Sequence, residues 1–233
     1  MASSAGYPLV AVEFFFGAVD LTHDSFSDLV LFAVCSCLAL RYLSFTRDRA
    51  GIGIACLLIA IAAFLGVIRF SDWNPLNEQT RGPHEFASKI AAVGAFPVLA
   101  FSLAFPDSPI ARRVSGAWWL AFVVGGFGFA VWLLAFKPWG QIAPALSGFW
   151  MVASVATAYR GTSRWLGIGG LVLLFTSLAV TVLINASSPL LGIFSPTQLL
   201  HYFLAAGLLL LACAAETAVR STLTTPENAL PSR

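Results

Sequence analysis

Seven long apolar segments constrain this chain more than any other feature. They lie at about residues 26–45, 50–70, 87–105, 115–136, 141–159, 164–185 and 197–219. A bilayer core about 30 Å thick needs about 20 apolar residues per helix, so every segment is long enough to cross it. Only 10% of the 233 residues are charged, whereas soluble domains carry about 25%. The sequence therefore predicts an all-α membrane protein built as a bundle of seven transmembrane helices.

The two ends of the chain differ from this bundle. Residues 1–25 contain PLVAVEFFFGAV, an apolar piece that includes Glu13 and is too short to cross a bilayer. We expect it to lie at the membrane interface, with its aromatic residues in lipid and its carboxylate in water. Residues 26–219 form the predicted transmembrane domain, and residues 220–233 form a polar tail that we expect to be disordered.

The basic residues predict an orientation. One side of the predicted bundle carries nine of them and the other side four. The nine are Arg41, Arg47, Arg49, Arg112, Arg113, Arg160, Arg164, Arg220 and Arg233, and the four are Arg69, Arg81, Lys89 and Lys137. Because cytoplasmic loops carry the excess of Lys and Arg, we place the N-terminus outside and the C-terminus in the cytoplasm. A net charge of +2 without a basic cluster argues against a nucleic-acid partner.

Polar residues gather at the predicted outer ends of four helices. Ionisable side chains in a span are costly and usually face a cavity or a partner. Asp24 and Asp28 lie one turn apart, on one face of the first helix. The other candidates are Arg69 and Asp72 after the second helix, His84 and Glu85 before the third, and Thr197 and His201 in the seventh.

Two interpretations of these residues stay open. They are either interfacial anchors and salt bridges at helix ends, or the lining of a polar pocket that opens on the outer side between the first, second, third and seventh helices. We expect Arg69 to pair with Asp28 or Asp72, at the roughly 4 Å of an ion pair.

Short sequence motifs bear on possible enzyme classes and on helix packing. The chain contains neither H-E-x-x-H nor G-x-S-x-G, the signatures of two large hydrolase groups. GGFG at residues 125–128 and GIGG at residues 167–170 are typical of helices that approach each other closely in a membrane. Pro97 and Pro144 fall within spans and are expected to kink them.

Four stretches resemble the CREST superfamily of seven-helix membrane hydrolases, and in particular small bacterial membrane proteins related to it. They are FSDLVLFAVCSCLALRYL in the first helix, ACLLIAIAAFLGVIRFS in the second, EFASKIAAVGAFPVLAF in the third and SPTQLLHYFLAAGLLLL in the seventh. The superfamily includes alkaline ceramidases, adiponectin-receptor-like proteins and the haemolysin III group. The resemblance implies a zinc ion held by one histidine of the second helix and an H-x-x-x-H pair of the seventh, whose bound water attacks a lipid amide.

This chain departs from that pattern at two of the three ligands. His201 matches the second histidine of the seventh helix, but Thr197 stands at the first. The second-helix histidine would fall near Arg69 or Phe70, and a fixed cation there opposes zinc binding. We therefore expect a bacterial inner-membrane protein with a degenerate hydrolase site, whose pocket binds a membrane lipid or other amphiphile, or docks a partner subunit.

Two alternatives remain at this point. The first is an active zinc-dependent lipid amidase, with His84 and His201 as metal ligands and Asp28 and His201 as catalytic residues. The second is a structural accessory subunit of a larger membrane complex.

Overall fold

The computed structural model describes residues 23–45, 49–71, 76–134, 136–183 and 194–224. Within these ranges the chain is helical, in the order α1 (His23–Leu40), η1 (Arg41–Phe45), α2 (Ala50–Phe70), α3 (Leu76–Ile90), η3 (Ala91–Ala95), α4 (Phe96–Ala104), α5 (Pro109–Arg112), α6 (Val114–Leu134), α7 (Trp139–Ala158), α8 (Gly161–Leu183) and α9 (Pro196–Thr224). The elements η1 and η3 are single π-helical turns.

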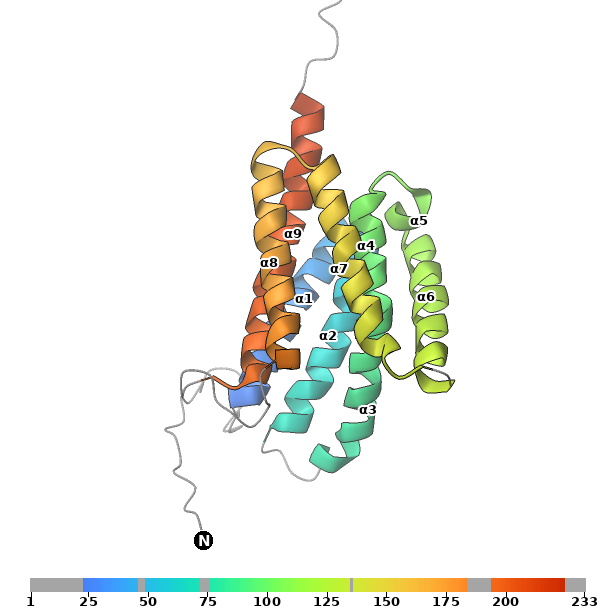
Figure 1. Cartoon of the computed structure of the whole chain (residues 1–233), viewed down its shortest axis with the longest axis vertical. Helices are drawn as coiled ribbons and strands as arrows, with labels where there is room; N and C mark the ends of the chain where they lie inside the picture. The colour runs from blue at the N-terminus through green and yellow to red at the C-terminus, as the bar shows by residue number, and fades with distance from the viewer. Residues whose placement is uncertain (1–22, 46–48, 72–75, 135, 184–193, 225–233) are drawn as a thin grey trace, which may run out of the picture.

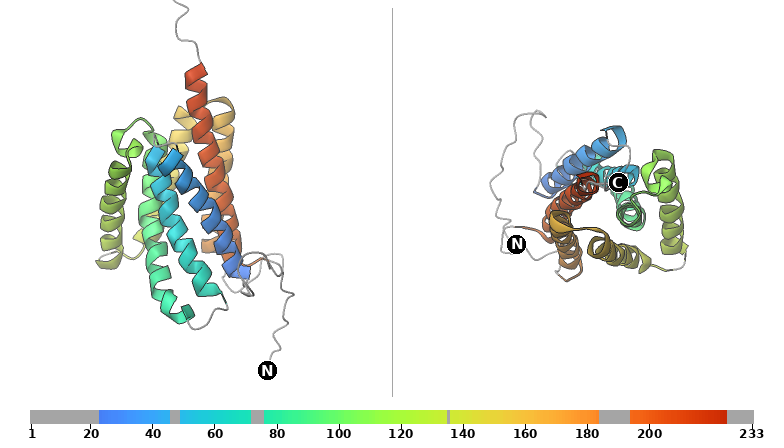
Figure 2. Two further views of the ribbon diagram at one scale, coloured as in Figure 1. Left: turned by 180° about the vertical axis from the view of Figure 1, so that it is seen from behind. Right: turned by 90° about the horizontal axis from the view of Figure 1, so that it is seen from above.

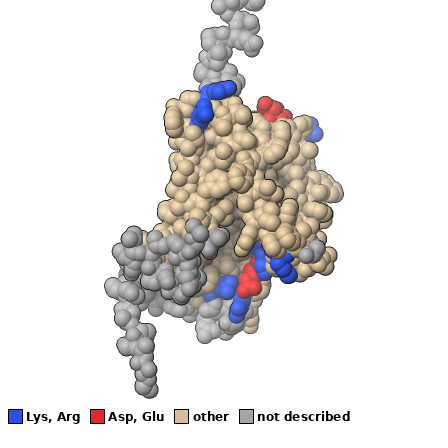
Figure 3. All heavy atoms as spheres, viewed as in Figure 1, with Lys and Arg blue, Asp and Glu red and all other residues tan. Residues whose placement is uncertain are grey.

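Seven spans in the described part of the chain are long and apolar enough to cross a membrane. They are Asp24–Phe45, Ala50–Phe70, Gln79–Ala104, Val114–Leu134, Trp139–Ala158, Gly161–Val180 and Pro196–Ala218. The predicted seven-helix membrane architecture is confirmed, and the chain has the fold of a multi-pass membrane protein. On the face shown in Figure 3, charged side chains gather at the two ends of the bundle and the middle is uncharged, as a bilayer requires.

The third span begins earlier than its apolar composition indicates. The sequence placed its start at residue 87, but α3 starts at Leu76, so the expectation that His84 and Glu85 precede the helix was wrong. The added turns are polar and amphipathic, and Arg81 and Glu85 form an i,i+4 ion pair at 3.3 Å along them. A helix needs apolar residues only where it is in lipid. An apolar pattern therefore predicts where a helix enters the lipid but not where the helix begins.

A π-helical turn interrupts this third span. It occupies Ala91–Ala95 and comes immediately before α4, whose second residue is Pro97. Proline cannot donate a backbone hydrogen bond, and its ring crowds the carbonyl one turn before it, so an irregular turn at this point fits the sequence. π-Helical turns within helices are frequent at functional sites.

The helices pack around α2, which has the largest buried share of the seven spans. α1 and α3 contact α2, α9 contacts both α1 and α8, and α7 contacts α4 and α8 (Figures 1 and 2). Small residues bring backbones together as predicted: a Cβ placed on Gly170 would lie 2.9 Å from the carbonyl oxygen of Gly207, and one on Gly94 would lie 3.2 Å from the Cα of Gly125. α6 lies on the outside of the bundle, beside η3 and α4 (Figure 2).

Alternating helix directions place the starts of α1, α3, α7 and α9 at one end of the bundle (Figure 1). This end also carries the last turn of α2, so the polar candidates of four helices share it. Which end faces the cytoplasm stays a prediction from the basic residues.

Candidate functional site

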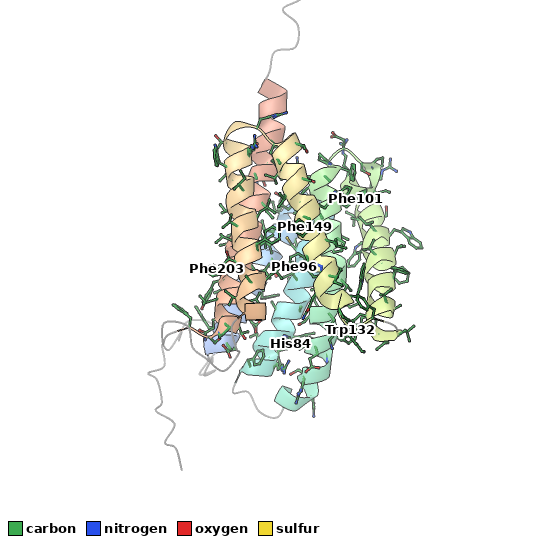
Figure 4. All side chains as sticks on the ribbon, in the orientation of Figure 1. His84, Phe96, Phe101, Trp132, Phe149 and Phe203 are labelled. Carbon is green, nitrogen blue, oxygen red and sulfur yellow. The ribbon has the colours of Figure 1, made fainter. Side chains whose placement is uncertain are left out.

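A cavity of about 170 Å³ lies among α1, α2, α3, η3, the start of α4, α8 and α9, towards the end where those candidates meet. We call it the polar pocket, after its five polar lining residues Asp28, His84, Ser88, Ser177 and His201. The rest of its lining is apolar and includes Leu31, Ile59, Ala63, Phe96 and Leu204. Figure 4 labels His84 near the lower end of the bundle and Phe96 above it.

Asp28 is the most deeply buried charged residue of the pocket. Its side chain is only 1% exposed, and its Oδ1 lies 3.5 Å from Nδ1 of His201. Its Oδ2 is buried and has no hydrogen-bond partner. The carboxyl group lies against the bare backbone of Gly66 on α2, where an added Cβ would stand 2.6 Å from Cγ and from both carboxyl oxygens. Only glycine at this position of α2 leaves room for the acid.

His201 is held by α1 through one ring nitrogen. Its Nδ1 lies 3.0 Å from the Oγ of Ser27, and that hydroxyl donates its proton to the carbonyl oxygen of Asp24 at 2.8 Å. We therefore assign the proton of the neutral ring to Nδ1, which donates to Ser27, and the lone pair to Nε2. A Ser-His-Asp triad needs serine and aspartate on opposite ring nitrogens, but here both Ser27 and Asp28 lie at Nδ1.

The second histidine of the pocket is held by an arginine. Nη1 of Arg69 lies 2.8 Å from Nδ1 of His84, and a guanidinium can only donate, so Nδ1 accepts. The ring proton is then on Nε2, which lies 3.4 Å from the Oγ of Ser88. Nη2 of Arg69 also lies 3.8 Å from Oε1 of Glu85, and its guanidinium lies 4.9 Å from the ring centroid of Phe70.

The expected pairing of Arg69 is therefore wrong for Asp28. The longer α3 carries His84 and Glu85 past the last turn of α2, where they take up the guanidinium. Asp72 lies outside the described residues. Arg69 is adjacent to the polar pocket through His84 and does not line it.

Asp24 and Thr197 lie outside the lining of the polar pocket. Asp24 accepts a hydrogen bond from Oγ of Ser195 at 2.8 Å, which ties the start of α1 to the start of α9. Ser195 and Gln198 form a capping box, with the Gln198 N–H donating to Oγ and the Ser195 N–H donating to the Gln198 side-chain oxygen, both at 3.1 Å. Thr197 is half-buried within this first turn and does not line the pocket.

The structure thus brings Asp28, His84 and His201 into one cavity and leaves Asp24, Glu85 and Thr197 outside its lining. The sequence did not single out Ser27, Gly66, Ser88 or Ser177. Two signals were available: Ser88 is four residues after His84, on the same helical face, and the S-x-x-Q of the α9 capping box is visible at residues 195–198.

These residues do not fit the zinc ion that the CREST resemblance implies. Among the described residues, no group of three or more His, Cys, Asp or Glu side chains could hold a metal ion. The Nδ1 atoms of both pocket histidines are engaged, one by Ser27 and one by the cation of Arg69. A guanidinium hydrogen-bonded to a candidate ligand also repels a dication.

No protein-family model, no curated protein and no solved structure matches this chain. The fold and the site define a class: a seven-helix, multi-pass membrane protein with a partly polar cavity near one end of its bundle.

Proposed function

We propose that the protein binds the polar head and first carbons of an amphiphile in the polar pocket, on a CREST-like scaffold whose hydrolase site has degenerated. The observation that carries this proposal is the composition of the cavity. Its walls are apolar side chains of several helices, and a buried carboxyl oxygen without a partner lies in its lining. Ligand sites typically combine apolar walls with a few placed polar groups.

The size of the cavity sets the size of the bound part. At about 30 Å³ for each water-sized group, 170 Å³ holds about five or six such groups. Whole drug-sized ligands need about 300–1,000 Å³. The pocket therefore suits a head group and a few methylenes, with the remaining chain outside it.

Binding suits the side-chain geometry better than hydrolysis. Neither Ser27 nor Ser88 has a histidine nitrogen free to act as its base, because Ser27 accepts from Nδ1 of His201 and Ser88 faces the assigned N–H of His84. The cation of Arg69 occupies the place that the resemblance gives to a zinc-binding histidine. We also propose that the pocket end of the bundle faces outward from a bacterial inner membrane, because it carries the smaller number of basic residues.

Photo-cross-linking tests this function. The probe is 1-dodecanol with a diazirine near its hydroxyl group, added to protein in phosphatidylcholine nanodiscs. Ala63 lines the pocket and is 2% exposed, so Ala63→Leu fills the cavity. Ala153→Leu makes the same change on the exposed face of α7 and is the control.

We expect adducts on residues that line the pocket, which Ala63→Leu removes and Ala153→Leu preserves. Adducts that are confined to lipid-facing positions and unchanged by both substitutions would contradict the proposal.

A further inference from the structure

In the polar pocket, more hydrogen-bond acceptors than donors lack a partner. The side chain of Asp28 is 99% buried, yet its Oδ2 has no partner. Buried polar atoms are nearly always hydrogen-bonded, so an orphaned carboxyl oxygen on a cavity calls for a donor from outside the protein. Gly66 holds this carboxyl group in place, since it lies directly against the α2 backbone.

Two further atoms of the lining are acceptors. The assigned lone pair on Nε2 of His201 has no hydrogen-bond partner among the described residues. Ser177 donates its hydroxyl proton to the carbonyl oxygen of Leu174 at 2.7 Å, so its Oγ is left as an acceptor. With Oδ2 of Asp28, three acceptors without a bound donor line the same cavity.

Most donors in and beside the pocket are already used; the exception is the Ser88 hydroxyl, which accepts from His84 and whose own proton has no acceptor among the described residues. Arg69 donates to His84 and pairs with Glu85 at 3.8 Å, so its charge is offset beside the pocket. The assigned N–H of His84 is directed to Ser88. Two acids outside the lining are engaged as well: Asp24 accepts from Ser195, and Glu85 pairs with Arg69. Among the described residues, no Lys or Arg side chain lies within ion-pair distance of Asp28, and its carboxyl group lies 3.5 Å from Nδ1 of the assigned neutral His201.

We infer that the head group bound in the polar pocket is a primary ammonium. An ammonium group brings one positive charge and three N–H donors. Its donors match the three open acceptors, and its charge would hold the Asp28 carboxyl group in the ionised form. A hydroxyl brings one donor and no charge, and a carboxylate brings no donor and a repelling charge. This inference rests on the proposed amphiphile binding and names the chemistry of the ligand.

Competition with the dodecanol probe tests the inference. Unlabelled dodecylamine, dodecanol and dodecanoate are each titrated until they halve the yield of pocket adducts in nanodiscs. The titrations are repeated with Asp28→Asn, and with Asp107→Asn, which makes the same change at an exposed position at the other end of the bundle. Both variants experience the same membrane partition, so the amine-to-alcohol ratio isolates the pocket.

For the wild-type protein and Asp107→Asn, we expect dodecylamine to compete at least about tenfold better than dodecanol, because a charge-assisted hydrogen bond is stronger than a neutral one. Dodecanoate should compete worst. Asp28→Asn should reduce the amine preference to within about threefold of the alcohol, since it removes the charge that selects the cation.

Equal competition by the three compounds in the wild-type protein would overturn the inference while leaving amphiphile binding intact, and this result does not depend on the folding of any variant. An amine preference that persists in Asp28→Asn would overturn it as well. A probe that labels no pocket residue would instead remove the proposed function itself.

Discussion

Gly66→Ala tests how tightly the pocket is built. Gly66 is buried in α2, and a Cβ there would lie 2.6 Å from Cγ, Oδ1 and Oδ2 of Asp28, well inside contact distance. Asp28 is 1% exposed and cannot swing into solvent, so the carboxyl group or α1 itself must move. Overpacking of a tight interior costs about 1–3 kcal/mol, and replacing glycine within a helix returns up to about 1 kcal/mol. We expect a net loss of about 1–2 kcal/mol.

The assay is reversible unfolding in mixed dodecyl maltoside and SDS micelles, with Gly126→Ala as the matched control. A Cβ on Gly126, in the middle of α6, would meet nothing within 4 Å, so this variant should gain up to about 1 kcal/mol from helix propensity alone. In an Asp28→Ala background the cost of Gly66→Ala should disappear, because the clashing group is gone. If Gly66→Ala stabilises the wild-type protein as Gly126→Ala does, the close packing of Asp28 on α2 is wrong.

Three further predictions concern the remainder of the bundle. Tyr42 is fully buried and its hydroxyl lies 3.2 Å from the carbonyl oxygen of Ala212, so Tyr42→Phe should lower the unfolding free energy by about 1 kcal/mol; an unchanged midpoint in the same assay would contradict this. Ser195→Ala removes the capping box of α9 and should cost about 1 kcal/mol, whereas Ser195→Thr, which keeps the hydroxyl that caps the helix and donates to Asp24, should keep most of the stability. A C-terminal fusion in a bacterial host should fluoresce with green fluorescent protein and be inactive with alkaline phosphatase, and the reverse result would invert the predicted orientation.

The apolar pattern was sufficient to predict the seven spans, because a bilayer imposes both length and composition on every helix. It failed at the start of α3, because residues 76–86 are helical although they are mostly polar. That error changed the surroundings of Arg69. A helix that continues to Leu76 brings His84 within 2.8 Å of the guanidinium, whereas the sequence favoured an acid as its partner.

Contacts between helices could not be predicted from sequence patterns, because they depend on how the helices are rotated and crossed against one another. Asp28 could be assigned to one face of α1 by its spacing from Asp24, but the rotation of α1 against α2 decides that this face meets Gly66. A glycine in an apolar run indicates close packing without naming the neighbour. His201 was singled out because it is a histidine within a span, and its partner Ser27 depends on how α9 crosses α1.

The central claim is that the polar pocket holds an amphiphile head beside Asp28. A cryo-electron microscopy map of the protein in nanodiscs containing dodecylamine tests this claim most directly. We predict density in the pocket within hydrogen-bond distance of Oδ2 of Asp28, continuing as a chain past the apolar lining, and its absence from Ala63→Leu. A well-resolved map in which the pocket is collapsed, or in which it holds only separate water peaks, would contradict the account.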